Sequence, residues 1–261
     1  MREIENKDLI NYLRDESVSQ EEKGLYLYEQ IDVQSIIDWL CLNLYLGNDD
    51  VSYKKNSVLW RTLQPEASPY GDCRWRWNVY DIDHAAVGAK PESVDFSDFS
   101  IISDNRFYWA LRTVPHFRQQ FVLTAMDMMN TNLSSENVEK VLGEWGLDLS
   151  YSNNYFLKRP EYMIQSLRNE FDLTGKVETV LLDINNAEAG NIYVNTVQTD
   201  FSDGTWEGKY FTDYPVIVTA VSNPGYEFVG WSGDEESQEN SINIYLEEGG
   251  TTLTAVFKEK K

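Results

Sequence analysis

Four oxygen-bearing side chains in the first third of the chain have types and a spacing suited to cation chemistry. Asp50 lies in an acidic loop that Asn56 closes, and Asp81 and Asp83 form a D-x-D motif after a further stretch rich in Trp and Val. Carboxylate and amide oxygens suit a divalent cation and the phosphates that it carries. We therefore expect the functional centre of the chain between residues 48 and 88.

The elements around this stretch would bring the four side chains near one another. Asp32 can cap a helix over residues 33–46, and Gly47 can end it. The acidic loop then starts at a helix C-terminus, where the helix dipole disfavours anions unless a cation is present. Alternating residues rich in Val, Trp and Tyr predict a β-hairpin from Ser57–Leu63 and Arg74–Ile82.

Helical and β-type patterns divide the chain into two parts. Helices are expected within residues 1–46 and at about 105–113, 114–129, 135–145 and 153–171, while residues 89–104 show little regular pattern. From Lys176 onwards short β-type runs predict strands at Val177–Ile184, Asn191–Val197, Val216–Val221, Ile242–Leu246 and Thr251–Phe257. The sequence predicts an α+β fold, with a mostly helical domain and a β-hairpin over residues 1–175 and a small all-β domain over residues 176–261.

Composition limits the function classes. The chain has 261 residues, 42% of them hydrophobic, which is enough for at least one sizeable core. Its net charge of −21 would repel a phosphate backbone, so we do not expect nucleic-acid binding. No stretch has the roughly 18–20 apolar residues of a membrane span. Cys41 and Cys73 are either two thiols, the reading we favour, or one disulfide in an exported protein.

Several motifs in a fixed order carry a family resemblance. They are Gly47-Asn48-Asp49-Asp50, then Asn56–Arg61, then Trp75–Asp83, and finally Phe156–Tyr162. In this order and spacing, residues 1–175 resemble the C-terminal part of the CotH kinase family, which is named for spore-coat kinases. The resemblance implies a protein-kinase-like fold in which ATP and Mg²⁺ serve phosphoryl transfer to Ser or Thr of a partner protein.

The resemblance also implies roles for individual residues. Asp50 matches the catalytic-loop aspartate, Asn56 a metal-ligating asparagine, and Asp81 the metal-binding aspartate, so Asn56 and Asp81 would also contact the nucleotide through the metal. Asp83 is either a second metal ligand or a residue that caps the turn. The acidic loop is one residue longer than is usual in the family, which leaves Asp49 and Asp50 as alternatives for the catalytic position.

The family's nucleotide-covering lobe has no counterpart in this sequence. Upstream of residue 30 there is no glycine-rich loop and no strand lysine. We therefore expect that the chain begins at the C-terminal lobe and that, by itself, it does not hold ATP in the usual way. Whether it belongs to an active enzyme is left open by the sequence.

The last part of the chain carries a second resemblance. A G-Y-x-F-x-G-W-S-G string at Gly225–Gly233 precedes an L-T-A-V-F strand at Leu253–Phe257. Residues 186–258 thereby resemble the divergent bacterial surface repeat of internalin-type proteins. This implies an exported protein, extracellular or at the cell surface, whose signal peptide is not in this chain.

Two functions from different classes follow. The first is Mg²⁺- and ATP-dependent transfer to a hydroxyl group of a partner protein. The second is a catalytically silent extracellular module that binds a protein or a glycan. Trp60, Trp75 and Trp77 could form a platform for stacking a sugar, although we expect them to serve packing within the hairpin.

Overall fold

The computed structural model describes residues 7–52, 54–86, 89–201 and 204–260. It divides into two compact units. The first takes residues up to 122 together with Leu142–Phe171, and the second takes Leu123–Val141 and Asp172 onwards. The observed architecture is α+β, as predicted, with helices in the N-terminal half and sheets in the C-terminal half.

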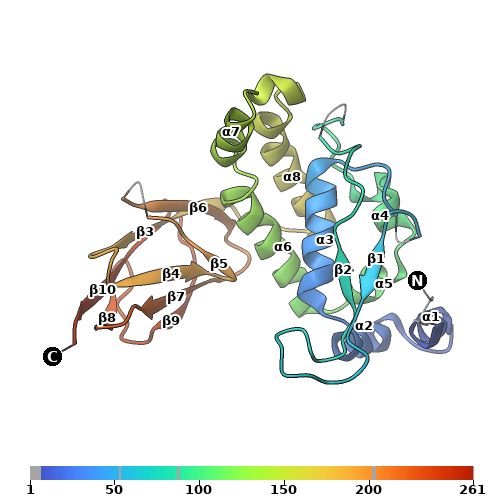
Figure 1. Ribbon diagram of the computed structural model, residues 1–261, viewed down its shortest axis with the longest axis horizontal. Helices are drawn as coiled ribbons and strands as arrows, with labels where there is room; N and C mark the ends of the chain where they lie inside the picture. The colour runs from blue at the N-terminus through green and yellow to red at the C-terminus, as the bar shows by residue number, and fades with distance from the viewer. Residues whose placement is uncertain (1–6, 53, 87–88, 202–203, 261) are drawn as a thin grey trace. The chain divides into compact units, whose positions relative to one another are not determined.

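Helices dominate the first half of the chain (Figure 1). Their central member is α3, whose sequence is apolar nearly all round and whose side chains are mostly buried. The α-helices are α1 Lys7–Arg14, α2 Gln20–Gln30, α3 Val33–Leu46, α4 Ser100–Ser103, α5 Arg106–Leu111, α6 Pro115–Asn130, α7 Ser135–Glu144 and α8 Tyr155–Phe171, with 3-10 turns η1 Phe96–Asp98 and η2 Leu149–Ser152.

The ends of α3 are set by the residues that the sequence predicted. The Asp32 side chain accepts a hydrogen bond from the backbone N–H of Ser35 at 3.2 Å and so caps the first turn. Gly47 closes the helix in the left-handed conformation, with φ 62°, which glycine adopts without a steric penalty. The acidic loop therefore begins at a fixed point.

A short β-hairpin lies against α3. Its strands β1 (Val58–Trp60) and β2 (Arg76–Asn78) are antiparallel, with Leu59 opposite Trp77. The Ser35 hydroxyl accepts from the Trp77 N–H at 2.8 Å and lies 3.2 Å from the Trp77 carbonyl oxygen, to which it donates. The hairpin prediction is confirmed, but both strands are shorter than expected, and residues 79–82 leave the sheet.

Residues 89–104 are not the patternless loop that we expected. They contain η1 and α4, and Phe96, Ile101 and Ile102 are buried. The Asp95 side chain accepts from the Ser97 N–H at 2.8 Å and starts the first turn. The expectation was wrong because two short helical turns are too brief to show a helical period in the sequence.

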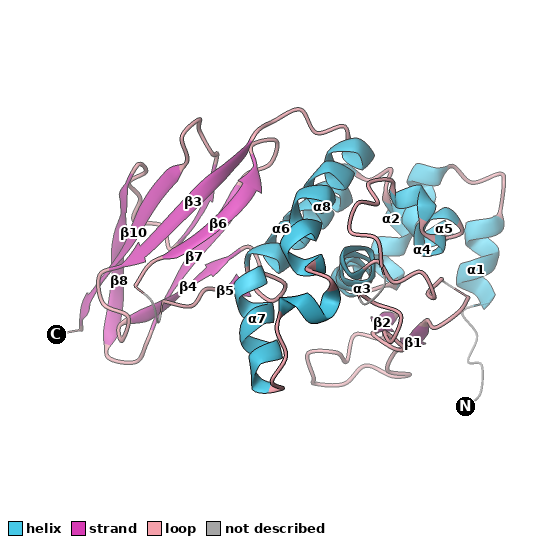
Figure 2. Cartoon of the chain, turned by 90° about the horizontal axis from the view of Figure 1, so that it is seen from above, coloured by secondary structure: helices cyan, strands magenta, loops and turns pink. Residues whose placement is uncertain are grey.

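The second unit contains two four-stranded sheets, drawn in magenta in Figure 2. Their strand orders are β6-β3-β10-β8 and β5-β4-β7-β9, and β10 and β3 are parallel whereas the other pairs are antiparallel. The strands are β3 Val177–Ile184, β4 Gly190–Val194, β5 Val197–Gln198, β6 Trp206–Phe211, β7 Val216–Ser222, β8 Tyr226–Gly233, β9 Ser241–Ile244 and β10 Thr251–Glu259. The five predicted β-runs all contain strands, while β6 and β8 were not predicted.

Trp231 lies in the core of this unit. Its side chain is buried, its ring centroid lies 5.5 Å from that of Phe228, and its indole N–H donates to the Glu239 carbonyl at 3.1 Å. Phe257 packs edge-on against Phe228 at 5.5 Å. The aromatic string and the final strand of the repeat motif therefore meet in one cluster, which accounts for their joint appearance in the sequence.

Candidate functional site

The structure brings Asp50 and Asn56 together. The Asn56 side-chain amide donates to the Asp50 carboxylate at 3.1 Å and to the Asp50 backbone carbonyl at 3.0 Å. The Lys55 ammonium forms an ion pair with the other carboxylate oxygen of Asp50. Lys55 therefore has a specific partner within the acidic loop.

These contacts favour the ionised form of the Asp50 carboxylate. The hydrogen bond from Lys55 is the largest cause of a lowered pKa of Asp50, and the charges of Lys55 and His84 and the bond from Asn56 act in the same direction. Asp49, in contrast, has an 81% exposed side chain, and its carboxylate lies 3.7 Å from the Nδ1 atom of His84. Of the two aspartates, Asp50 is the one hydrogen-bonded to Asn56.

Asn48 links the acidic loop to the segment after the hairpin. Its side chain is 1% exposed, and its carbonyl accepts from the Asp50 N–H at 3.2 Å. Its amide donates to Asn43 at 2.9 Å and, through a long contact of 3.5 Å, to the Asp81 carbonyl. The sequence motif contained Asn48 but gave it no role, although an asparagine directly after a helix-ending glycine was a usable signal.

The D-x-D motif contacts the described part of the acidic loop through the backbone carbonyl of Asp81, not through its carboxylates. Asp81 and Asp83 are exposed, and within the described residues neither carboxylate has a hydrogen-bond or ion-pair partner. Asp81 and Asn56 both have positive φ, 56° and 55°, which Asp and Asn tolerate better than most residues. Within the same described ranges, no group of three His, Cys, Asp or Glu side chains could hold a metal ion.

The acidic loop, the hairpin and the D-x-D motif all lie in a region of the chain that matches a known protein family. The family model described as CotH kinase protein matches residues 3–146, more than half of the chain. The chain belongs to the CotH kinase protein family. A second model, described as divergent InlB B-repeat domain, matches residues 182–261. No curated protein and no solved structure matches the chain significantly.

The two matches confirm the arrangement that the sequence motifs indicated, a CotH part followed by one surface repeat. They support a kinase-like module in a surface protein. They are also compatible with an extracellular or cell-surface location. None of the helices in the described ranges combines the length and the apolar character needed to cross a membrane.

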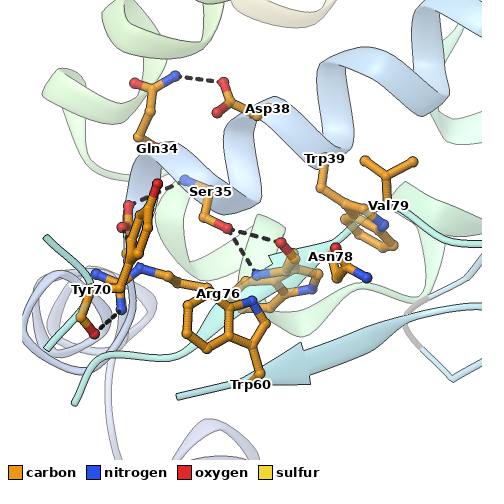
Figure 3. A pocket seen from close by; sticks show the side chains of 11 residues that line it. Gln34, Ser35, Asp38, Trp39, Trp60, Tyr70, Arg76, Asn78 and Val79 are labelled. Atoms are coloured by element: carbon orange, nitrogen blue, oxygen red, sulfur yellow. Dashed lines mark hydrogen bonds and ion pairs between the residues drawn. The ribbon is translucent and has the colours of Figure 1, made fainter. Parts of the chain in front are cut away.

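The CotH part has a cleft beside the hairpin, which Figure 3 shows from close by. It has a volume of about 520 Å³ and lies between the N-terminal half of α3 and strands β1 and β2. Trp75 and Trp77 are buried, as expected for packing, whereas Trp60 and Tyr70 are 40% and 56% exposed. Two of the aromatic rings around the hairpin are therefore accessible to a ligand.

Arg76 forms the floor of this aromatic cleft. Its guanidinium forms ion pairs with Asp32 at 3.0 Å and Asp72 at 2.9 Å. It also lies 5.6 Å from the ring centroid of Trp60 and 5.3 Å from that of Tyr70, within the range of cation–π attraction. The Arg76 guanidinium therefore contacts the rings of Trp60 and Tyr70 while its charge is neutralised by Asp32 and Asp72.

Asp38 supplies a carboxylate at the rim of the cleft. It accepts a hydrogen bond from the Gln34 side chain at 2.7 Å, a pair that Figure 3 also draws. Although the residue is exposed, desolvation of its carboxylate by the surrounding protein raises the pKa of Asp38, and the charge of Asp32 adds to this. A cleft with accessible rings and a carboxylate at its rim suits a ligand that has both apolar and hydrogen-bonding groups.

Cys41 is buried, Cys73 is partly buried, and neither forms a disulfide within the described residues. The Cys73 backbone N–H donates to the Thr62 hydroxyl at 3.2 Å, and φ of Cys73 is 63°. This contact ties the loop between β1 and β2 back onto itself. The cysteines therefore have packing roles here, and neither lies in the acidic loop.

Proposed function

We propose that this chain is the kinase-like module of an exported surface protein and that it serves transfer of the γ-phosphoryl group of ATP to a Ser or Thr hydroxyl of a partner protein. The observation that carries the proposal is the Asp50–Asn56 hydrogen bond, because these residues occupy the two acidic-loop positions that the CotH family resemblance assigns to the reaction. Asn48 supports it by connecting Asp50 with the backbone of Asp81.

In this proposal Asp50 orients the substrate hydroxyl and accepts its proton. The hydroxyl oxygen forms a bond to the γ-phosphorus while the bond to the bridging β–γ oxygen breaks, and ADP leaves with that oxygen. An ionised carboxylate is required at the start, and the ion pair with Lys55 favours that form of Asp50. Asn56 restricts the rotation of the Asp50 side chain.

The donor types fit Mg²⁺, which prefers oxygen ligands. Asn56 uses its amide nitrogen on Asp50, so its carbonyl oxygen is the atom that would ligate a cation, and Asp81 offers a carboxylate without a partner in the described ranges. Asp83 would be a further ligand or a residue of the turn. When bound, Mg²⁺ would neutralise charge on the phosphates. Asp81 and Asn56 would thereby also position the nucleotide.

The proposal can be tested by calorimetric titration of the full-length protein with ATP in the presence of Mg²⁺. We expect saturable binding that Asp81→Ala weakens at least about tenfold, since a metal ligand is lost. Asp104→Ala is the matched control, because Asp104 is also exposed but lies in α4–α5 connecting sequence outside the site. Equal affinity of the Asp81→Ala and Asp104→Ala variants would count against the assignment of Asp81.

A second candidate function is binding without transfer. The exposed rings of Trp60 and Tyr70 in the aromatic cleft favour it, because accessible aromatic rings bind protein or glycan partners. The match to a surface repeat also supports a surface protein that binds a partner.

The two candidates give different results in the same titration. Binding of Mg²⁺ and ATP by the full-length protein favours the kinase-like function. Absence of nucleotide binding, combined with binding of a glycan or surface protein that Trp60→Ala abolishes, favours the second candidate. Trp145→Ala is the control for that variant, since Trp145 is 79% exposed and lies outside the aromatic cleft.

A further inference from the structure

A second pocket of the first unit collects cations in an otherwise acidic chain. It has a volume of about 430 Å³ and lies where the turn between α1 and α2 meets the start of α5. Arg14, Lys23 and Arg106 line it, and Glu16 is the one acidic residue among the lining side chains. The lining therefore carries a net charge of +2, whereas the whole chain carries −21.

The three cationic side chains have no anionic partner of their own. Within the described residues, none of them forms a side-chain hydrogen bond or an ion pair, even with Glu16 beside them. In a chain with 43 acidic and 22 basic residues, a cation ordinarily finds a carboxylate nearby. The three cations of this pocket differ from that expectation because none of them is paired with a carboxylate in the part of the chain that the structure describes. Together they give the pocket a positive electrostatic potential.

Lys23 is the decisive member of the group. It belongs to α2, its residue is only 4% exposed, and it lines the pocket rather than the open surface. Asp15 feels its charge, but the Asp15 carboxylate is bound by the N–H and the hydroxyl of Ser17 at 2.9 and 2.6 Å. An ammonium group on a side chain that is almost entirely buried, with no bonded anion among the described residues, would gain free energy from an anion in the pocket.

The N-terminus of α2 faces the same space. Ser19 and Gln20, the cap and the first residue of this 11-residue helix, both line the pocket. The first backbone N–H groups of a helix lack partners within the helix, and the helix dipole favours anions there. The Ser19 hydroxyl accepts from the Glu22 N–H at 3.2 Å, and the Glu22 carboxylate accepts from the Ser19 N–H at 3.0 Å and from its hydroxyl at 2.7 Å. This capping box leaves the N–H groups of Gln20 and Glu21 for a ligand.

We propose that this pocket binds a phosphate group. A phosphate dianion matches the net charge of +2, the Arg14 and Arg106 guanidinium groups can each bind two of its oxygens, and Lys23 supplies a point charge. The pocket is larger than one phosphate, and Leu13 and Val18 add an apolar wall, so it also has room for the group that carries the phosphate. The chemistry is shared by inorganic phosphate and phosphomonoesters, and it does not depend on transfer at Asp50.

The experiment is calorimetry on the full chain in a phosphate-free buffer of low ionic strength, without Mg²⁺ or nucleotide. The ligands are inorganic phosphate, a phosphoserine peptide and the same peptide without phosphate. We expect binding of the phosphate-bearing ligands only, with Arg14→Gln and Arg106→Gln each weakening it at least about tenfold. Tighter binding of the phosphopeptide identifies a monoester site, and equal affinity identifies a site for the free ion.

Lys158→Gln is the matched control, because Lys158 is an exposed cation of the same unit that does not line the pocket. We expect it to bind phosphate as the unchanged chain does. Arg14 and Arg106 are exposed, so their variants avoid the loss of folding that a change at buried Lys23 could cause. The proposal is overturned if the chain does not bind phosphate. It is also overturned if the two arginine variants and Lys158→Gln bind phosphate with the same affinity.

Discussion

The Nε of Arg159 lies 3.0 Å from the carbonyl oxygen of Tyr45, to which it donates a hydrogen bond at the last turn of α3. The same guanidinium donates to the carbonyls of Leu44 at 2.7 Å, Pro91 at 3.0 Å and Ser93 at 2.6 Å. Arg159 is fully buried, and burial lowers its pKa. It therefore holds the negative end of α3, directly before the acidic loop, with a positive charge.

Arg159→Met should loosen the end of α3. The substitution leaves several buried carbonyl groups without a donor, and we expect the opening free energy of α3 amides to fall by roughly 3 kcal/mol. Native-state hydrogen exchange of α3 measures this. The neighbouring exposed Lys158→Met should change the same value by less than about 0.5 kcal/mol. Equal protection in the two variants would show that Arg159 does not hold the helix end.

Lys55→Met should raise the pKa of Asp50 toward its ordinary value of 3.8, because the hydrogen bond and the charge that lower it are removed. Titration of the Asp50 carboxyl carbon by NMR measures the change. Lys158→Met should leave the Asp50 titration in place, since Lys158 is an exposed lysine of the same unit and is not among the groups that lower the pKa of Asp50. A pKa that is the same in both variants would contradict the ion pair.

Acid should weaken the loop of the hairpin through Asp72. Partial burial acts to raise the pKa of Asp72, but hydrogen bonds from Arg74 and Arg76 outweigh it and lower the pKa to about 2 from 3.8. Because the folded-state pKa is the lower one, the stabilisation is present above about pH 4 and is lost as the pH falls toward 2. The indole NMR signal of Trp60 should follow this loss, and Asp72→Asn should flatten it. If the pH dependence of the Trp60 signal is the same in the Asp72→Asn variant, the ionisation of Asp72 is not its cause.

Tyr210→Phe should weaken the second unit. The Tyr210 hydroxyl donates at 2.7 Å to the buried carboxylate of Asp127, which also accepts from Asn195 at 2.8 Å. Loss of one bond to a charged group should lower the opening free energy of β6 amides by roughly 1.5–3 kcal/mol, measured by hydrogen exchange. The exposed Tyr245→Phe is the control. If both variants exchange alike, the bond contributes nothing measurable.

Local signals predicted much of the helical part. Helix α3 begins after Asp32 and ends at Gly47, as expected. Such ends can be predicted because a capping side chain and a left-handed glycine act on backbone groups within one turn of themselves. Strand β6 was missed because Gly208 interrupts it, and glycine ordinarily weakens a strand. The structure gives the reason for this glycine: a Cβ there would lie 2.3 Å from the ring of Trp206.

The assignment of Asp50, Asn56, Asp81 and Asp83 to the site stays a prediction, and the contacts among the site residues could not be read from the sequence. The bond between Asp50 and Asn56 spans six residues and follows from a short loop. The positions of Asn48 and Arg159 depend on contacts between distant segments, which no local pattern reports. Arg159 and Tyr45, for example, are 114 positions apart in the sequence. Buried polar residues of this kind are understood only from the carbonyl groups that they satisfy.

The most direct test of the central claim is phosphoryl transfer by the full-length protein, measured with γ-³²P-labelled ATP and Mg²⁺ on a protein acceptor. We expect transfer that Asp50→Asn and Asp81→Ala each reduce at least about a hundredfold, and that Asp104→Ala leaves unchanged. Unchanged transfer in the Asp81→Ala protein would contradict the proposed site, as would the absence of transfer by the unmodified full-length protein that binds Mg²⁺ and ATP.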